Sequence, residues 1–192
     1  MTSVDQLKTA TPVKRLRWIP FIVLIVLMGL LRISPGFFEE RPLPLLMGSL
    51  MGPALLGLLM LLWWATFSRA PLTEKLIGFG LSILIMIVGM MTMDSTMQGM
   101  GGMIYAIPTA CASLGVALSI ASGWQSRTRM LFALACFTIT FGAWNLVQSE
   151  GVDGTFQADL RWRWLKTREQ EYLSSLKPAV EQPRRGVFIG LR

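Results

Sequence analysis

The chain has 192 residues, of which 53% are hydrophobic and only 15% are charged, whereas soluble domains carry about 25% charged residues. Its net charge is +7 without a long basic run, which argues for membrane orientation and against nucleic-acid binding. Histidine is absent, and there is no Ser/His/Asp or Cys/His set, no CxxC and no glycine-rich phosphate loop. These absences argue against a hydrolase, an NTPase or a zinc enzyme, and we expect a chain that is not catalytic by itself.

The apolar residues are concentrated in the middle of the chain. Only ten charged residues lie between Trp18 and Val147, and the remaining nineteen lie in the two ends. Because a transmembrane helix needs about 20 mostly apolar residues, this predicts an all-α integral membrane protein with a bundle of about five transmembrane helices. The expected order is a cytoplasmic polar arm at 1–15, spans at about 16–33, 45–67, 76–93, 103–124 and 130–147, and a junction and tail at 148–192.

Small residues distinguish two of the predicted spans. Gly48 and Gly52 lie four residues apart in the second span, and Gly57 follows them; small residues at such spacing let two helix backbones approach closely. The fourth span is rich in Ala, Gly, Ser and Cys, so we expect it to be the central, most enclosed helix. Cys111 and Cys136 fall inside apolar segments and are expected to be packing residues without a disulfide or a metal.

The Lys and Arg residues predict how the chain crosses the membrane. An odd number of spans puts the two termini on opposite sides. With the N-terminus in the cytoplasm, the cytoplasmic side holds eight basic residues, and the opposite short loops hold only Arg32 and Arg41. The eight are Lys8, Lys14, Arg15, Arg17, Arg69, Lys75, Arg127 and Arg129. Because cytoplasmic loops carry the excess of Lys and Arg, we expect a cytoplasmic N-terminus and an extracytoplasmic tail.

Four residues near the predicted span ends are candidate functional residues: Asp94, Tyr105, Trp144 and Asn145. An ionisable residue in or beside a span suggests a proton- or quinone-linked role, but the position of Asp94 at the predicted end of the third span favours a solvated loop residue or a turn cap. The aromatic residues and the amide suit anchoring at the membrane interface, and they also suit a pocket for a quinone headgroup. The sequence leaves these alternatives open, and no cofactor-binding residue is assigned.

The stretch Met86–Met103 contains seven methionines. Thioethers are soft ligands for Cu(I), whereas methionine is also an ordinary apolar filler of helices. The spacings that would suit a copper relay are Met91/Met93 and Met97/Met100/Met103. A copper-handling protein is therefore one alternative, and an ordinary apolar helix with a glycine-containing loop is the other.

The polar tail opens with a turn signature, Gly151 and Gly154 around Asp153. Aromatic and basic residues alternate beyond it, which predicts a collar at the membrane surface because Trp side chains favour the interface. The collar consists of Phe156, Arg161, Trp162, Arg163 and Trp164.

A short amphipathic helix is predicted after the collar. The pattern Thr167–Gln170, TREQ, is a capping box, and it predicts a helix over about Arg168–Leu176 that ends at Pro178. One face of this helix carries Tyr172, Leu173 and Leu176.

The tail also carries a family resemblance. The run Gly151–Trp164, GVDGTFQADLRWRW, followed by Thr167 and by Glu169–Leu173, EQEYL, resembles a junction in bacterial membrane-tethered proteins with a PQQ-binding-like β-propeller. These proteins are similar to quinoprotein alcohol and polyvinyl-alcohol dehydrogenases. In them a multi-span region ends in an acidic-glycine turn, a Trp-Arg-Trp element and a short helix, and an extracytoplasmic propeller follows. The resemblance covers about Gly151–Leu176, and Leu165-Lys166 stands where the family usually has a Thr-Pro pair.

The resemblance implies a membrane anchor module for an extracytoplasmic PQQ-like β-propeller dehydrogenase in the bacterial inner (cytoplasmic) membrane, with contact to membrane quinone left open. PQQ, calcium and the catalytic acid are expected in the propeller, outside this chain. The implied partners are the lipid bilayer and a propeller domain or subunit. The alternatives are a stand-alone small membrane protein, such as a transporter component or an assembly factor, and the Met-rich copper-handling protein.

Overall fold

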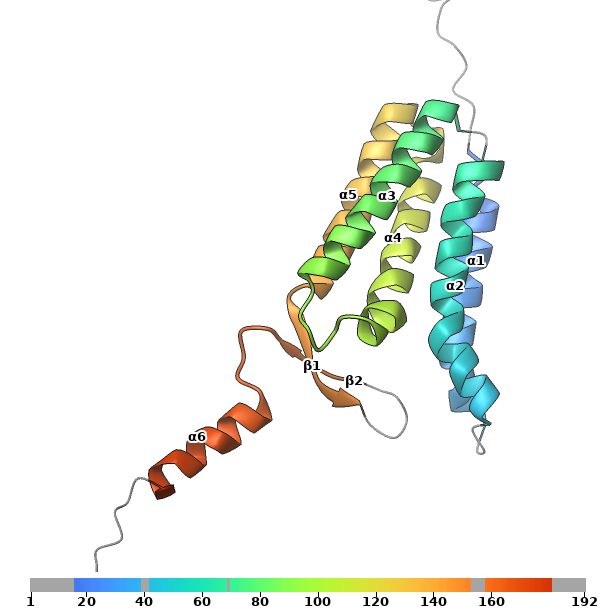
Figure 1. Ribbon diagram of the computed structural model, residues 1–192. Helices are drawn as coiled ribbons and strands as arrows, with labels where there is room; N and C mark the ends of the chain where they lie inside the picture. Colours follow the sequence, from blue (N-terminus) through green and yellow to red (C-terminus); the bar gives the residue numbers. More distant parts are fainter. Residues whose placement is uncertain (1–15, 39–41, 69, 153–157, 181–192) are drawn as a thin grey trace, which may run out of the picture.

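The computed structural model describes residues 16–38, 42–68, 70–152 and 158–180. In this part of the chain five long helices lie side by side, a β-hairpin packs against one end of them, and a further helix projects beyond the hairpin (Figure 1). The α-helices are α1 (Ile19–Ile33), α2 (Leu43–Phe67), α3 (Leu72–Thr92), α4 (Ile107–Ile120), α5 (Ser126–Trp144) and α6 (Arg168–Val180). Three short turns flank them: η2 (Ser34–Phe37), the π-helical η3 (Gly102–Ala106) and η4 (Ala121–Gly123).

Within the described residues, four helices are long and apolar enough to cross a membrane. They are Ile19–Phe37, Leu43–Phe67, Leu72–Thr92 and Gly102–Gly123, in which the short turns extend α1 and α4. The helix α5 is not one of them, because its first turn carries Arg127 and Arg129 among polar residues. The expectation of a membrane protein made of transmembrane helices is therefore supported by four candidate spans, one fewer than the sequence predicted.

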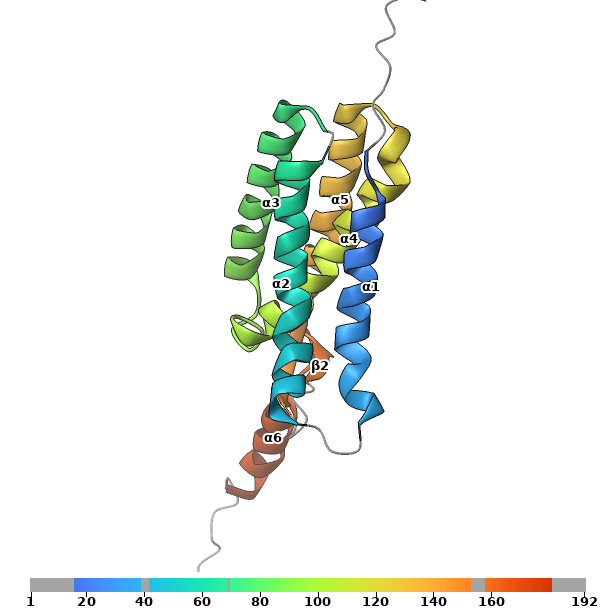
Figure 2. The same cartoon turned by 90° about the vertical axis from the view of Figure 1, so that its right-hand side faces the viewer.

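The helix α4 lies at the centre of the bundle and packs against α1, α2 and α5 (Figure 2). More than half of its span, 56%, is buried, compared with 39% for the span of α2, the next most buried. This confirms the prediction that the small-residue helix is the most enclosed one. Cys111 of α4 is fully buried and free, and Cys136 of α5 is partly buried and free, so both serve as packing residues.

Glycines allow large side chains to enter the helix interfaces. A Cβ on Gly57 would lie 2.9 Å from Cβ of Cys111, so α2 and α4 approach closely there. Gly78 of α3 accommodates the Trp64 ring. The expected close approach occurs at Gly57 and at Gly52, where a Cβ would lie 2.9 Å from Cδ1 of Leu31. The expectation is wrong for Gly48, because nothing lies within 4 Å of the position that a Cβ would take there. Spacing alone does not say which face of a helix meets a neighbour.

The end of α5 leads into a β-hairpin, which corrects the all-α assignment. The strands β1 (Val147–Val152) and β2 (Ala158–Trp162) pair antiparallel, with Val147 opposite Trp162. The register shifts between Ser149 and Val152, where Gly151 has a φ of +150° that side-chain-bearing residues rarely adopt. The helix α5 ends at Trp144, three residues before the expected end of the fifth span, because Val147 already belongs to a strand.

Part of the turn that the sequence predicts in the tail lies outside the residues that the structure describes. Asp153, Gly154 and the collar residue Phe156 are outside the described residues. The hairpin was not predicted because its strands are short and their alternation is weak, so only the turn glycines gave a signal.

The helix α6 begins with reciprocal capping-box hydrogen bonds. The Gln170 backbone N–H donates to Thr167 Oγ1 at 3.2 Å, and the Thr167 N–H donates to Gln170 Oε1 at 3.4 Å. The helix continues to Val180, so the prediction that Pro178 ends it is wrong. One missing N–H donor weakens a helix without fixing the residue at which it stops.

Candidate functional site

The hairpin packs at one end of the bundle (Figure 1). The contacts of the four candidate residues of the sequence place them at this end. Asp94 follows the end of α3, Tyr105 belongs to η3, and Trp144 and Asn145 are the last residue and the C-cap of α5. The fold therefore gathers residues that are up to 51 positions apart (145 minus 94) in the sequence.

Asp94 is the acceptor in a turn. Its Oδ1 accepts hydrogen bonds from the Thr96 backbone N–H at 3.0 Å and from Thr96 Oγ1 at 2.8 Å. Its Oδ2 lies 3.6 Å from Nε of Arg163. The two Thr96 hydrogen bonds lower the pKa of the carboxyl group most, burial raises it by less, and the Arg163 charge adds the smallest lowering effect. Asp94 is thus an ionised turn cap at neutral pH, and these contacts account for it without a proton-transfer role.

Tyr105 connects three elements of this end. Its ring stacks on Trp144 of α5 with ring centroids 5.6 Å apart, and its hydroxyl accepts a hydrogen bond from the Ala158 backbone N–H of β2 at 3.1 Å. The guanidinium of Arg32, at the end of α1, lies 5.2 Å from the ring centroid in a cation–π contact. The Trp144 indole N–H donates to Thr109 Oγ1 at 2.8 Å, so both aromatic residues are held by side chains of the bundle.

Asn145 joins the ends of α3 and α5. Its Oδ1 accepts a hydrogen bond from Thr92 Oγ1 at 3.1 Å, and its Nδ2 donates to the Phe141 carbonyl at 3.3 Å. Among the residues that the structure describes, the second amide proton has no partner. Asn145 therefore has a donor to offer to a molecule that lies beside it.

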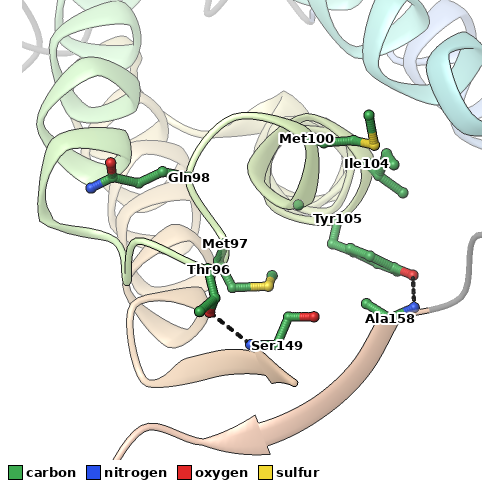
Figure 3. A pocket seen from close by; sticks show the side chains of 9 residues that line it. Thr96, Met97, Gln98, Met100, Ile104, Tyr105, Ser149 and Ala158 are labelled. Carbon is green, nitrogen blue, oxygen red and sulfur yellow. Dashed lines mark hydrogen bonds between the residues drawn. The ribbon is translucent and has the colours of Figure 1, made fainter. Parts of the chain in front are cut away.

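A small cavity lies between the hairpin and the bundle (Figure 3). The Ser149 backbone N–H donates to Thr96 Oγ1 at 2.9 Å on one side of it, and the Tyr105–Ala158 hydrogen bond closes the other side. Its volume is about 90 Å³, which corresponds to about three water molecules at about 30 Å³ each. Drug-sized ligands occupy about 300 Å³ or more, so this space suits water rather than a cofactor ring.

A larger groove runs between α3 and α5, with a volume of about 330 Å³. Aliphatic and aromatic side chains line most of it, and the Thr92–Asn145 pair lies at one end. The lining residues are Leu84, Ile85, Val88, Gly89, Thr92, Thr138, Phe141, Gly142 and Asn145. The groove is therefore mostly apolar and has hydrogen-bonding groups at one end.

The collar residues of the sequence have two different environments. Trp162 and Trp164 stack with ring centroids 5.1 Å apart and remain half-exposed or more, at 50% and 66%. The two collar arginines instead form ion pairs: Arg163 with Asp94, and Arg161 with Glu150 at 3.3 Å. Among the described collar residues, the two tryptophans therefore present the exposed apolar surface.

Glu150 connects the hairpin to α6. Its Oε2 lies 3.3 Å from Nε of Arg161 and 3.3 Å from Nε of Arg168, as ion pairs without hydrogen-bond geometry. Its Oε1 accepts a hydrogen bond from the Arg168 backbone N–H at 2.9 Å. Arg168 also pairs with Asp159 of β2 at 2.9 Å. These contacts fix the first residue of α6 to both strands.

A buried ion pair at the opposite end of the bundle was not predicted from the sequence. Glu74 in the first turn of α3 and Arg129 in the first turn of α5 are each only 2% exposed. Arg129 Nη2 and Nε lie 2.6 Å and 3.0 Å from the two Glu74 oxygens, and Ser126 Oγ donates to the same carboxylate. By sequence, Arg129 was counted only as a cytoplasmic loop charge. The sequence did carry a signal for this pair, because Glu74 and Arg129 each lie at the start of an apolar segment and both starts fall on the same side of the predicted bundle.

The methionine stretch is divided between core and surface. Met93 and Met97 are buried, whereas Met91, Met100 and Met103 are exposed. The thioethers of Met90 and Met93 both approach Gly102, a pairing that the copper-relay spacings did not include. Buried methionines here fill space beside small residues.

The chain was compared with known proteins in three ways. No family model, no curated protein and no solved structure matches it.

Proposed function

We propose that this chain is a membrane anchor module that holds an extracytoplasmic domain at the surface of a bacterial inner membrane. In this proposal the helix bundle anchors the chain in the membrane, and the hairpin together with α6 holds the extracytoplasmic domain. The resemblance of Gly151–Leu176 to a family junction gives the class of the held domain as a PQQ-like β-propeller dehydrogenase. The catalytic residues, PQQ and calcium belong to that domain in this proposal.

The topology in this proposal has five spans, with the N-terminus in the cytoplasm. The helix α5 has 19 residues, or about 28 Å of length, close to the hydrocarbon thickness of a bilayer. Its buried arginine is paired with Glu74, which lowers the cost of placing that charge within the membrane. Lys75, Arg127 and Arg129 all lie at the end of the bundle assigned to the cytoplasm, as the positive-inside rule requires.

The observation that carries the proposal is a continuous set of polar contacts from the bundle to α6. Thr96 and Tyr105 bind the backbone of the two strands, Asp94 pairs with Arg163, and Glu150 binds the start of α6. A tail that served only as a polar terminus would not need these bonds. The helix α6 then points away from the bundle end (Figure 1).

The exposed face of α6 supports a docking role. Tyr172, Leu173 and Leu176 are 65%, 53% and 41% exposed, and they lie on one side of a helix whose other residues are mostly polar or charged. Because α6 projects beyond the bundle rather than along it, we assign this face to the held domain and the stacked Trp162–Trp164 pair to the membrane surface.

Contact with membrane quinone is part of the proposal. The groove between α3 and α5 is lined mostly by apolar side chains and ends at the Thr92–Asn145 pair. An isoprenoid quinone combines a long apolar tail with carbonyl acceptors, and the second amide proton of Asn145 would donate to one carbonyl. The groove opens beside the end of the bundle that carries the tail.

Deletion of the gene in its native host tests the anchor role. We expect PQQ- and calcium-dependent dye reduction to leave the membrane fraction. It should move to the soluble extracytoplasmic fraction where the propeller is a separate subunit, and disappear where the propeller is a domain encoded by the same gene. Expression of the full chain from a plasmid should return the activity to the membrane. An unchanged distribution of this activity after deletion would refute the proposal.

A further inference from the structure

The ends of α3 and α5 opposite the hairpin share one buried, hydrogen-bonded ion pair. Both oxygens of Glu74 are occupied by Arg129 at 3.0 Å and 2.6 Å, and Ser126 provides a further donor. The remaining Arg129 nitrogen, Nη1, lies 3.4 Å from the Ser122 carbonyl in η4. Within the described part of the chain, the partners of the carboxylate therefore come from α5, and the pair is closed to solvent.

We infer that this ion pair makes the membrane insertion of α5 depend on α3, and so decides on which side of the membrane the tail lies. The inference rests on the five-span topology proposed above. It assigns to Glu74 a role in topology that is separate from the stability of the finished bundle.

The helix α5 is the bundle helix that most needs such help. The other four bundle helices are apolar enough to cross a membrane by composition, and α5 is not. Arg127 is exposed at the very start of α5, so its long side chain can reach the lipid headgroups. Arg129 lies half a turn deeper, and its side chain is only 3% exposed. Without a carboxylate beside it, this guanidinium would enter the bilayer unpaired, at a large cost in free energy.

The charge rule for topology gives a different expectation. It counts Lys and Arg, and acidic residues contribute little to it, so removing the negative charge of Glu74 should leave the orientation unchanged. The ion-pair mechanism instead expects the same substitution to leave α5 outside the membrane, with the tail in the cytoplasm. The two mechanisms therefore differ in whether the substitution changes the topology.

A reporter at the end of the full chain, after Arg192, distinguishes them. Alkaline phosphatase folds to its active form only outside the cytoplasm, and its activity is divided by the amount of full-length fusion on an immunoblot, so that degraded protein does not count. For the wild type we expect active phosphatase. For Glu74→Gln we expect specific activity below about half of the wild-type value, because α5 no longer inserts efficiently.

Two double variants form the matched comparison. Arg129→Leu added to Glu74→Gln should restore the activity, because it removes the unpaired charge. Arg127→Leu added to Glu74→Gln makes the same change of residue type two positions away, and it should restore much less. Wild-type activity in Glu74→Gln, or equal restoration by both double variants, would overturn the inference. An inactive wild-type fusion would instead overturn the five-span topology itself, and with it this inference.

Discussion

The Asp94 carboxylate and the Arg163 guanidinium join the helix bundle to the segment that follows the hairpin, with Oδ2 and Nε 3.6 Å apart. The Asp94 side chain is only 19% exposed, whereas that of Arg163 is 52% exposed. The pair is therefore partly screened by solvent, and its contribution to tail docking should be about 0.2–1 kcal/mol.

The docking of the tail onto the bundle should weaken at low pH. The pKa of Asp94 in the folded protein lies below its ordinary value of 3.8, so its stabilising contribution is present above that value and is lost as the pH falls through the lowered pKa. We expect the protection factor of the Ser149 amide against hydrogen exchange to be constant from neutral pH down to about pH 5 and to fall below about pH 4, as the docking contact is lost. The variant Asp94→Asn should have a lower protection factor at neutral pH and no such fall. An identical pH profile for the two proteins would contradict the assignment.

The Tyr105 hydroxyl should hold β2 to the bundle. Tyr105→Phe keeps the stacking on Trp144 and removes the acceptor of the Ala158 N–H, which should weaken hairpin docking by about 0.5–1.5 kcal/mol. Faster amide exchange is expected at Ala158 with no change in the helices. Tyr172→Phe, on the exposed face of α6, is the control and should leave the hairpin as it is.

Two glycines of one helix should respond differently to the same substitution. A Cβ on Gly78 would overlap the Trp64 ring, whereas nothing lies within 4 Å of the position of a Cβ on Gly80. Gly78→Ala should lower the stability of the bundle by about 1–3 kcal/mol, because the buried tryptophan must shift. Gly80→Ala should be neutral or slightly stabilising through its helix propensity. Thermal unfolding in detergent compares them, and equal midpoints would refute the tight α2–α3 contact.

The cap of α6 should be measurable on its own. Thr167→Ala removes the hydroxyl that accepts the Gln170 N–H and should destabilise α6 by about 0.5–2 kcal/mol. Amide exchange in the first turn of α6 should quicken accordingly. Ser175→Ala, which changes a hydroxyl bonded only within its own helix, serves as the comparison. A similar effect of both substitutions would show that the cap does not hold the helix.

The helices of the bundle were largely predictable from the sequence, because long apolar runs have few alternatives to helices inside a bilayer. The central place of α4 followed from its small residues, since only small side chains allow neighbours to approach on several sides. The faces of the helices were not predictable: Gly48 has the same spacing signal as Gly52, yet nothing lies near the position of a Cβ on Gly48. Apolar residues cover the whole circumference of these helices, so periodicity carries little information about neighbours.

The sequence predicted where in the bundle the candidate residues lie, but not which residues they contact. Asp94, Tyr105, Trp144 and Asn145 all lie near the ends of helices, and a bundle necessarily brings helix ends together. Of the four, only Tyr105 has a partner in the described part of the unpredicted hairpin, whose strands donate hydrogen bonds to Thr96 and Tyr105. Trp144 and Asn145 instead bind residues of the bundle. The pairing of Glu74 with Arg129 was missed because charges at the ends of spans usually lie in solvent or headgroups, and only the packing of α3 on α5 buries them.

The side of the membrane that holds the tail is the central claim. Ser175 is exposed on α6, so Ser175→Cys in the full chain can be labelled with a membrane-impermeant maleimide in cells whose outer membrane has been opened. The account predicts labelling at Ser175→Cys without disruption of the inner membrane, and labelling at Ser3→Cys only after disruption. Labelling of Ser175→Cys only after disruption of the inner membrane would contradict the extracytoplasmic tail and the anchor function built on it.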